Sequence, residues 1–234
     1  MANKLTPENI EAAAQHLENI QSGATPILDK QPEGENYTKV SATGNVDKQK
    51  VYPLIPPNDP RLLMQVAPFL DENLEQFGFA DRKDLSKVMY DNMAKYGGLG
   101  LSANQVGLPY RMFVMGGHPQ IEDGKVRSVF NPLINDVSPE SINLKEGCLS
   151  FPFLFLSIKR PKWCSVKYTD ENGEEIEETL HGMSARIFMH ENEHMNGYVF
   201  IDLVSKLKLE RAEKSKQKMI KEIKRRQGAP KIIK

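Results

Sequence analysis

Cysteine is scarce in this chain: among its 234 residues, only Cys148 and Cys164 carry a thiol. Two cysteines make no disulfide framework, and their scarcity fits a reducing compartment. Long apolar runs are missing too, so no segment approaches the roughly 20 residues of a membrane-spanning helix. The N-terminus lacks the apolar core of a secretory signal, and Glu8, Glu11 and Glu18 argue against an Arg-rich transit peptide. We therefore expect a cytoplasmic protein that does not enter a membrane.

An excess of charge of one sign is also absent, because Lys plus Arg and Asp plus Glu each total 31. This balance argues against a general attraction to DNA or to an acidic membrane surface. The balance hides an asymmetry, since residues 206–234 carry a net charge of +9 that the rest of the chain compensates. Nothing breaks a helix in this tail before Gly228, so we expect a basic helix. The simpler alternative is a solvated helix without a partner.

The chain divides into three parts by composition. Residues 51–205 are long enough to bury one core, given an overall hydrophobic content of 39%. Residues 1–50 form an appendage, in which Thr6 and Pro7 are typical of the start of a short helix. Its second half is polar, which predicts an extended or mobile arm, and a surface tail without function is the plainer interpretation. Residues 206–234 form the basic tail.

Hydrophobic spacing predicts both helices and strands in the central part. Large apolar residues recur at helical spacing between Leu85 and Tyr96, and Gly97-Gly98 favours a stop there. A second helix is expected over residues 184–196. Strands are predicted over 111–115, 128–134, 163–170 and 176–180, with an Asn172-Gly173 turn between the last two.

The segment 190–194, His-Glu-Asn-Glu-His, places two histidines four residues apart on the second helix. That spacing puts His190 and His194 on one face, where both can reach one metal ion. Glu191 is rotated by roughly 100° about the helix axis, so it is better placed to move a proton than to bind the metal. The alternative is a solvated helix with two incidental histidines. The apolar residues Ala185, Ile187, Phe188 and Met189 argue against it, because a polar face on a buried helix needs partners.

A candidate third ligand is Cys148, within the segment 146–150, Glu-Gly-Cys-Leu-Ser. Gly147 permits close backbone approach, and a thiolate is a strong ligand for zinc or ferrous iron. Taken alone, Cys148 is explained equally well as a buried structural thiol. Cys164 lies in a strand-like run, and we interpret it as structural.

Three blocks, in this order, resemble the signature blocks of peptide deformylases. They are Gly-Leu-Gly-Leu-Ser-Ala-Asn-Gln at 98–105, the Glu-Gly-Cys-Leu-Ser segment and the His-Glu-Asn-Glu-His segment. Each block is short, but their ordered combination is specific. Segments 58–62 and 197–202 are also similar to the family, so the resemblance covers roughly residues 51–205.

This resemblance implies an α+β fold, with mostly antiparallel sheets around a central helix that carries the His-Glu-His motif. It implies removal of the formyl group from the N-terminal formyl-methionine of nascent chains, with release of formate. It implies one divalent metal held by Cys148, His190 and His194: ferrous iron in the cell, with zinc, nickel or cobalt also able to bind. Some deformylases dock a C-terminal helix on the ribosome, and the basic tail would be attracted to RNA phosphate.

The resemblance also implies roles for single residues. Glu191 would take a proton from the attacking water and pass it to the departing amine. The Gln105 side-chain amide and the Leu149 backbone N–H would donate to the oxygen on which negative charge develops. A glycine at the substrate strand would let the peptide backbone approach closely. The expected substrate contacts are Leu99, Gly100 and Gly147.

Several positions depart from the family pattern. Ser102 stands where Ala is usual, a small change that we expect to be silent. Glu193 replaces the usual Asp before the second histidine, and we expect it to alter the groups that orient a metal ligand. Glu146 and Arg160 are candidates for a supporting ion pair, although an ordinary surface pair explains them nearly as well.

The apolar run at residues 151–156 is the largest departure. It is either extra core or a lining of the peptide entrance that favours apolar residues after methionine. Two rival functions stay open from the residues. A His-Glu-His metallopeptidase would have no use for the Gln105 and Cys148 blocks. A non-catalytic protein that acts through its basic tail would have no use for Glu191.

Overall fold

The computed structural model describes residues 35–40 and 46–227, with side chains from 51 to 225. The short helix expected after Thr6 lies outside these residues. The strands of the described part are β1 Glu35–Val40, β2 Val46–Val51, β3 Gly100–Ser102, β4 Met112–Gly116, β5 Val126–Val137, β6 Ser141–Cys148, β7 Phe151–Pro161, β8 Trp163–Thr169 and β9 Glu175–His181. Its α-helices are α2 Arg82–Lys95, α3 Gly182–Met195 and α4 Lys206–Gln227. Short 3-10 turns lie at Pro60–Leu63, Asp71–Asn73, Glu75–Phe77, Ala103–Val106, Glu122–Gly124 and Phe200–Leu203.

The largest sheet has five strands in the order β3-β4-β5-β8-β9, and all of its pairs are antiparallel. The four strands predicted from the sequence correspond to β4, β5, β8 and β9. Asn172 and Gly173 lie in the turn between β8 and β9, where Gly173 adopts a φ of +84°. The predicted α+β class with mostly antiparallel sheets is confirmed.

Two further antiparallel hairpins complete the strands of the described part. The strands β1 and β2 pair over their whole length, within the segment predicted to be an extended arm. The strands β6 and β7 pair from Ser141↔Pro161 to Cys148↔Phe151. The hairpin of β6 and β7 was not predicted, and it brings the apolar run at 151–156 into a strand.

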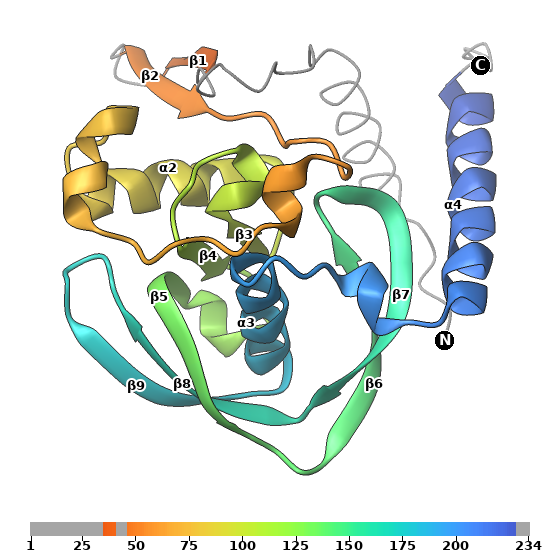
Figure 1. Cartoon of the computed structure of the whole chain (residues 1–234). Coiled ribbons are helices and arrows are strands. Elements are labelled where there is room, and N and C mark those ends of the chain that lie inside the picture. Colours follow the sequence, from red (N-terminus) through yellow and green to blue (C-terminus); the bar gives the residue numbers. More distant parts are fainter. Residues whose placement is uncertain (1–34, 41–45, 228–234) are drawn as a thin grey trace.

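Helix α3 lies at the centre of the fold, with the five-stranded sheet wrapping one side of it and β7 reaching its other side (Figure 1). Its Phe188 is fully buried and makes an edge-to-face contact with Phe113 of β4, with ring centroids 5.1 Å apart. Burial of one such aromatic side chain contributes about 2–3 kcal/mol. The helix therefore has a fixed position from which its polar face can present a site.

Helix α2 covers the other side of β3 and β4 and follows the helical spacing seen in the sequence. Asp81 caps its N-terminus by accepting a hydrogen bond from the Asp84 N–H at 2.8 Å. The predicted stop is confirmed, because Gly97 follows the last turn with a φ of +67°. Buried residues of this helix in the first core cluster are Leu85, Val88, Met89 and Met93.

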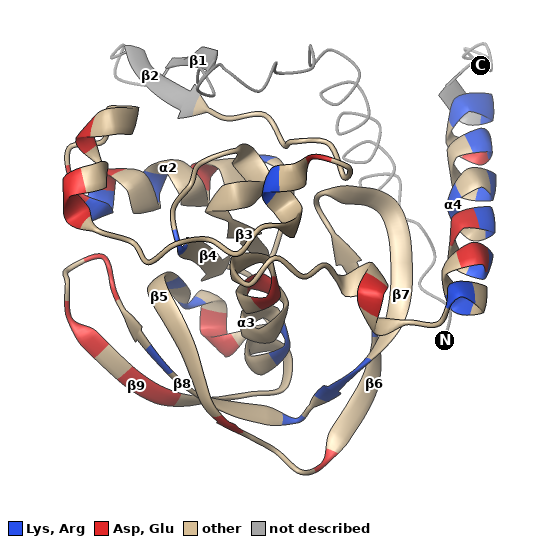
Figure 2. Cartoon of the chain, in the orientation of Figure 1, with Lys and Arg blue, Asp and Glu red and all other residues tan. Residues whose placement is uncertain are grey.

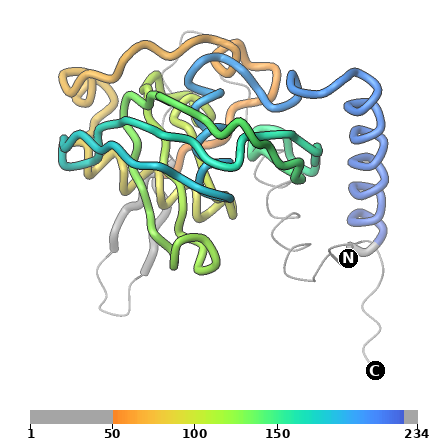
Figure 3. Tube along the Cα trace, turned by 90° about the horizontal axis from the view of Figure 1, so that it is seen from below, coloured from red at the N-terminus to blue at the C-terminus, as the bar shows by residue number. Residues whose placement is uncertain are grey.

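Helix α4 stands beside the main body against β7 (Figures 1 and 3). Leu209 and Ala212 of this helix pack on a third core cluster that includes Leu154 and Leu156 of β7. Basic residues dominate the remaining surface of α4, whereas acidic residues gather on β9 (Figure 2). Within the described residues, no helix is both long enough and apolar enough to cross a membrane.

Candidate metal centre

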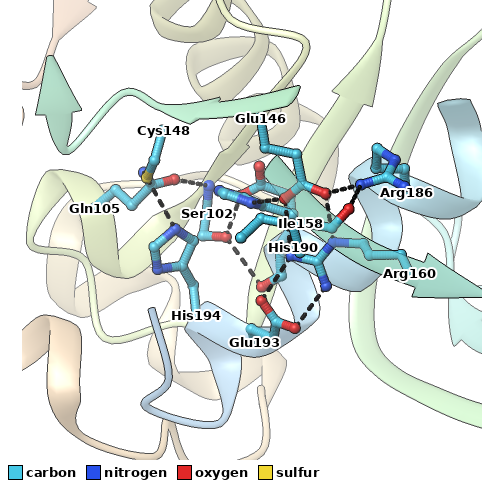
Figure 4. A network of polar contacts seen from close by, with 11 residues as sticks. Ser102, Gln105, Glu146, Cys148, Ile158, Arg160, Arg186, His190, Glu193 and His194 are labelled. Carbon is cyan, nitrogen blue, oxygen red and sulfur yellow. Dashed lines mark hydrogen bonds and ion pairs between the residues drawn. The ribbon is translucent and has the colours of Figure 1, made fainter. Parts of the chain in front are cut away.

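The candidate metal ligands converge from two elements that are far apart in the sequence. Cys148 ends β6, while His190 and His194 lie one turn apart on α3. One potential ligand atom from each residue lies within 4.8 Å of the other two. The Cys148 Sγ is 3.3 Å from the His194 Nε2 (Figure 4). The fold thus brings together the three residues expected from the sequence.

Glu146 orients the first histidine of this cluster. One oxygen of its carboxylate lies 3.2 Å from the His190 Nδ1, which leaves the Nε2 to face the cluster. Burial lowers the pKa of His190, but hydrogen bonds with Cys148 and Glu146 outweigh burial and hold that pKa well above its usual value. A divalent cation at the Nε2 would take the place of the proton shared with Cys148, while the Nδ1–H would keep its contact with Glu146.

The pKa of the second histidine, His194, is shifted in the opposite direction. Burial, followed by the charges of His190 and Arg160, lowers the pKa of His194 well below its usual value. A neutral imidazole is the form that binds a metal. With one thiol and two imidazoles at short range, the donor set fits a catalytic zinc or iron site, in which three protein ligands leave one position open.

A buried ion cluster surrounds Glu146. Arg160 donates to both oxygens of Glu146, at 2.7 and 3.0 Å, and to both oxygens of Glu193, at 2.6 and 2.9 Å. Arg186 donates to Glu146 and to the backbone oxygens of Ile158 and Ile142. Since Glu146 is 7% and Arg160 3% exposed, the pair predicted between them is no surface pair.

This cluster keeps Glu146 ionised beside the metal ligands. Burial raises the pKa of Glu146, but hydrogen bonds with His190 and Arg160 lower it to about 2. The carboxylate is therefore ionised near neutral pH and accepts from the His190 N–H. Glu193, which was expected to alter the groups that orient a metal ligand, accepts from Arg160 and so helps to hold the arginine that contacts Glu146.

Glu191 is buried beside the metal-ligand cluster of Cys148, His190 and His194. Its Oε2 accepts a hydrogen bond from the Ser102 hydroxyl at 2.6 Å, and Ser102 lies on β3. Burial raises the pKa of Glu191 above its usual value, against a lowering by the charge of His190 and the hydroxyl of Ser102. A carboxyl group with a raised pKa can both take and return a proton near neutral pH. Ser102, which was expected to be a change without effect, thus contacts Glu191, the predicted proton-handling group.

Gln105 lies beside Cys148, in the turn that follows β3. Its Nε2 is 3.5 Å from the Cys148 Sγ and 3.0 Å from the Ser150 Oγ, while its Oε1 accepts a hydrogen bond from the Ser102 N–H at 2.9 Å. These contacts turn the amide N–H groups toward the cluster (Figure 4). Leu149 directly follows Cys148, in the turn between β6 and β7.

The expected substrate contacts lie around this cluster. Gly100 is in β3, which forms one edge of the five-stranded sheet and so offers an edge to an extended peptide. Leu99, just before it, is half-buried against the second core cluster. Gly147 lies beneath Phe155, since a Cβ on residue 147 would be 2.9 Å from Phe155 Cε1.

Two side chains of this site, Ser150 and Arg186, were not singled out in the sequence, and Ser102 was singled out only as a change expected to be silent. Ser150 and Ser102 belong to the recognised blocks, but their partners lie on other elements. Arg186 is a buried charge within an otherwise apolar turn of α3, and that contrast was the one available signal of its role.

Comparisons with known proteins agree with this geometry. The sequence pattern of the family described as polypeptide deformylase matches residues 54–210. The peptide deformylase of Thermotoga maritima is 41% identical over 152 residues, which cover 64% of this chain and 85% of the relative. The peptide deformylase of Wolbachia sp. subsp. Brugia malayi is 40% identical over 175 residues, which cover 68% of this chain and 96% of the relative.

Solved structures are similar as well. The crystal structure of peptide deformylase from Ehrlichia chaffeensis matches with a TM-score of 0.63 and 35% identity. That match covers 74% of this chain and 99% of the Ehrlichia chain.

Proposed function

The chain belongs to the polypeptide deformylase family, and we propose that its Cys148–His190–His194 cluster holds the metal on which that activity depends. The protein removes the formyl group from N-terminal formyl-methionine of nascent polypeptides. The observation that carries our proposal is the convergence of three ligand atoms within 4.8 Å of one another. A divalent ion held there supplies Lewis acidity to the reaction.

Glu191 acts as the proton-handling group in this proposal. Its raised pKa and its burial beside the cluster suit a carboxylate that takes a proton from water and returns it to the departing amine. Gln105, whose N–H groups face Cys148, and the Leu149 backbone N–H donate to the oxygen on which charge develops. Leu99, Gly100 and Gly147 contact the substrate, with the peptide lying along the β3 edge.

Ferrous iron is the metal that we propose for the cell, and zinc, nickel and cobalt are the alternatives. A thiolate with two imidazoles accepts each of these ions, so metal availability decides between them. Two unpaired cysteines suit the reducing environment that keeps iron ferrous, and we place the enzyme in the cytoplasm.

Residues 51–205 form the catalytic domain in this proposal, between an appendage at 1–50 and the basic tail at 206–234. The tail contacts the ribosome in this proposal, because α4 packs on the domain through Leu209 and Ala212 while most of its described Lys and Arg residues are exposed. Figure 2 shows that basic residues recur along this helix. Such a surface is attracted to RNA phosphate. This position would hold the active site near emerging chains.

Anaerobic purification followed by metal analysis and a formyl-Met-peptide assay tests the site. We expect one metal per chain, with metal loss in Cys148→Ala and retention of metal without turnover in Glu191→Ala. Full activity of Glu191→Ala would contradict the role of Glu191. The same preparations separate the rival functions, because a metallopeptidase would cleave internal bonds without formate release and a binding protein would release no formate.

A further inference from the structure

We propose that Ser102 is a positioning residue whose hydroxyl fixes the carboxylate of Glu191 for the deformylation reaction. The inference rests on the proposed role of Glu191 and adds a group that acts through it. It concerns a position where the sequence suggested a silent change from Ala.

The hydroxyl of Ser102 has one donor proton, and the structure gives it a clear acceptor. Its Oγ lies 2.6 Å from the Glu191 Oε2 and 3.3 Å from the Glu191 backbone oxygen. The shorter distance is typical of a hydroxyl that donates to a carboxylate. Ser102 is fully buried and Glu191 is 4% exposed, so water does not compete freely for this bond.

The second oxygen of Glu191 lies beside Gly100. A Cβ built on residue 100 would lie 2.8 Å from the Glu191 Cδ, so the carboxylate fills the space beside this glycine. Gly100 and Ser102 are next-but-one neighbours on β3, so a Cβ at residue 100 and the Ser102 side chain lie on the same face of the strand. This face therefore holds Oε2 by a hydrogen bond and leaves Oε1 beside the edge along which the peptide would lie.

A carboxylate needs such an anchor because its terminal torsion is soft. The last torsion of a Glu side chain has broad minima and does not by itself select one orientation. The bond to Ser102 removes that freedom before substrate arrives, and groups that are oriented in advance lower the cost of reaching the transition state. The hydroxyl thus acts on the orientation of Glu191 and does not touch the substrate.

The backbone of Ser102 serves a different group, which makes the hydroxyl separable. Its N–H donates to the Gln105 Oε1 at 2.9 Å. Ser102→Ala keeps this N–H and so leaves Gln105 in place. Alanine removes only the hydroxyl of Ser102 and adds no atom, so the β3 backbone accommodates it.

The test compares Ser102→Ala with wild type as metal-loaded enzymes, using a formyl-Met-Ala peptide. We expect kcat to fall about tenfold, as for loss of one hydrogen bond to a charged group, with KM within about twofold. Metal content and Tm should stay at the wild-type values. The matched control is Ser86→Ala on α2, a buried serine whose Oγ has no partner in the described residues, and it should leave kcat unchanged.

A double variant shows whether the effect passes through Glu191. Glu191→Asp draws the carboxylate back from Ser102, so adding Ser102→Ala should change its residual single-turnover rate by less than about twofold. A wild-type kcat in Ser102→Ala would overturn the inference, as would an equal loss in the Glu191→Asp background or a loss that follows metal content. Glu191→Ala separates this failure from failure of the proposed function: if that variant is inactive while Ser102→Ala is fully active, only the inference about Ser102 fails.

Discussion

The carboxylate of Glu191 occupies the space that a side chain on residue 100 would need. A Cβ on Gly100 would lie 2.8 Å from the Glu191 Cδ and 2.9 Å from its Cγ. The sequence suggested that this glycine makes room for the substrate backbone. The structure adds a reason within the protein, because residue 100 must be a glycine for Glu191 to reach its position.

Gly100→Ala should therefore damage catalysis more than metal binding. The new methyl group would push the carboxylate away, and a displacement of about 1 Å can lower kcat on the order of 100-fold. The three atoms nearest to this methyl group all belong to Glu191 and none to a ligand side chain, so metal content should stay at one per chain. Steady-state kinetics on a formyl-Met peptide, together with metal analysis, would measure both quantities.

Gly173→Ala is the matched control for this variant. Gly173 lies in the β8–β9 turn with a φ of +84° and open space around it, so alanine there strains the backbone without touching the site. It should lower stability by about 1 kcal/mol and leave kcat unchanged. Equal losses of kcat in the two variants would mean that Gly100→Ala acts through stability alone.

A second prediction concerns the contribution of Glu178 to the free energy of unfolding and how that contribution changes with pH. This carboxylate accepts hydrogen bonds from Arg127, a side chain only 5% exposed, at 2.7 and 2.9 Å. Burial raises the pKa of Glu178, but the bonds from Arg127 and Tyr168 hold it below its usual value of 4.5. A depressed pKa means that the carboxylate stabilises the fold above the unfolded pKa and loses this effect as pH falls through the folded pKa.

Glu178→Gln should therefore lower the free energy of unfolding by about 1.5 kcal/mol at pH 7, and by clearly less at pH 3. Urea unfolding at the two pH values would measure this difference. Glu177→Gln is the control, since Glu177 is 63% exposed and pairs with Lys167 at the surface, where little stability is at stake. A loss at Glu178 that is as large at pH 3 as at pH 7 would contradict the assignment.

The sequence predicted the histidine pair because the relevant information is local. Four residues on one helix fix the relative position of His190 and His194 wherever the helix lies. Cys148 was different: its distance from the histidines depends on how β6 packs on α3, and only its resemblance to a family block selected it. The same limit explains Ser102, whose partner Glu191 is 89 residues away in the chain.

The hairpin of β6 and β7 was also missed because local sequence patterns did not indicate it. The first five residues of β6, Ser141–Lys145, alternate polar and apolar side chains, but all five are exposed, so this short alternation does not mark a buried face. The run at 151–156 was apolar enough to suggest core, and Phe151, Leu154 and Leu156 are indeed buried. Phe155 is the exception at 45% exposed, and no sequence pattern separated it from its neighbours.

A third prediction is that Phe155 favours substrate peptides with an apolar residue after the formyl-methionine. Its exposed ring lies against Gly147, next to Cys148, with the Lys145 Nζ 5.6 Å from the ring centroid. Phe155→Ser should lower the ratio of kcat/KM for formyl-Met-Phe over formyl-Met-Ala peptides by about fivefold, because an apolar contact is lost. Phe153→Ser, at the half-buried position two residues earlier, should have a smaller effect.

Leu133→Ser controls for removal of an exposed apolar side chain. Leu133 lies on β5 and is 56% exposed, so its loss should leave the ratio of the two peptides unchanged. An unchanged ratio in folded, metal-loaded Phe155→Ser and Phe153→Ser variants would reject the preference. The whole run would then be core and surface without a part in substrate choice.

The last prediction concerns the basic face of α4. Lys214, Lys218 and Lys221 are exposed and lie on one side of this helix, away from the Leu209 and Ala212 contacts with β7. Truncation after Ser205 would uncover the third core cluster as well as remove charge. Changing these three lysines to Gln removes the charge alone, so turnover of a formyl-Met peptide should be unchanged.

Binding to ribosomes should respond differently from turnover. If the three lysines contact RNA phosphates, their loss should weaken binding at low salt and reduce the slope of log K against log salt by about 2. Lys83→Gln, Lys87→Gln and Lys95→Gln on α2 form the matched control, since they remove the same charge from another exposed helix and should leave the slope unchanged. Sedimentation with ribosomes over a salt series would measure both triple variants. Equal weakening by the two would point to net charge alone, and no binding of the wild type at low salt would remove the ribosome as a partner of α4.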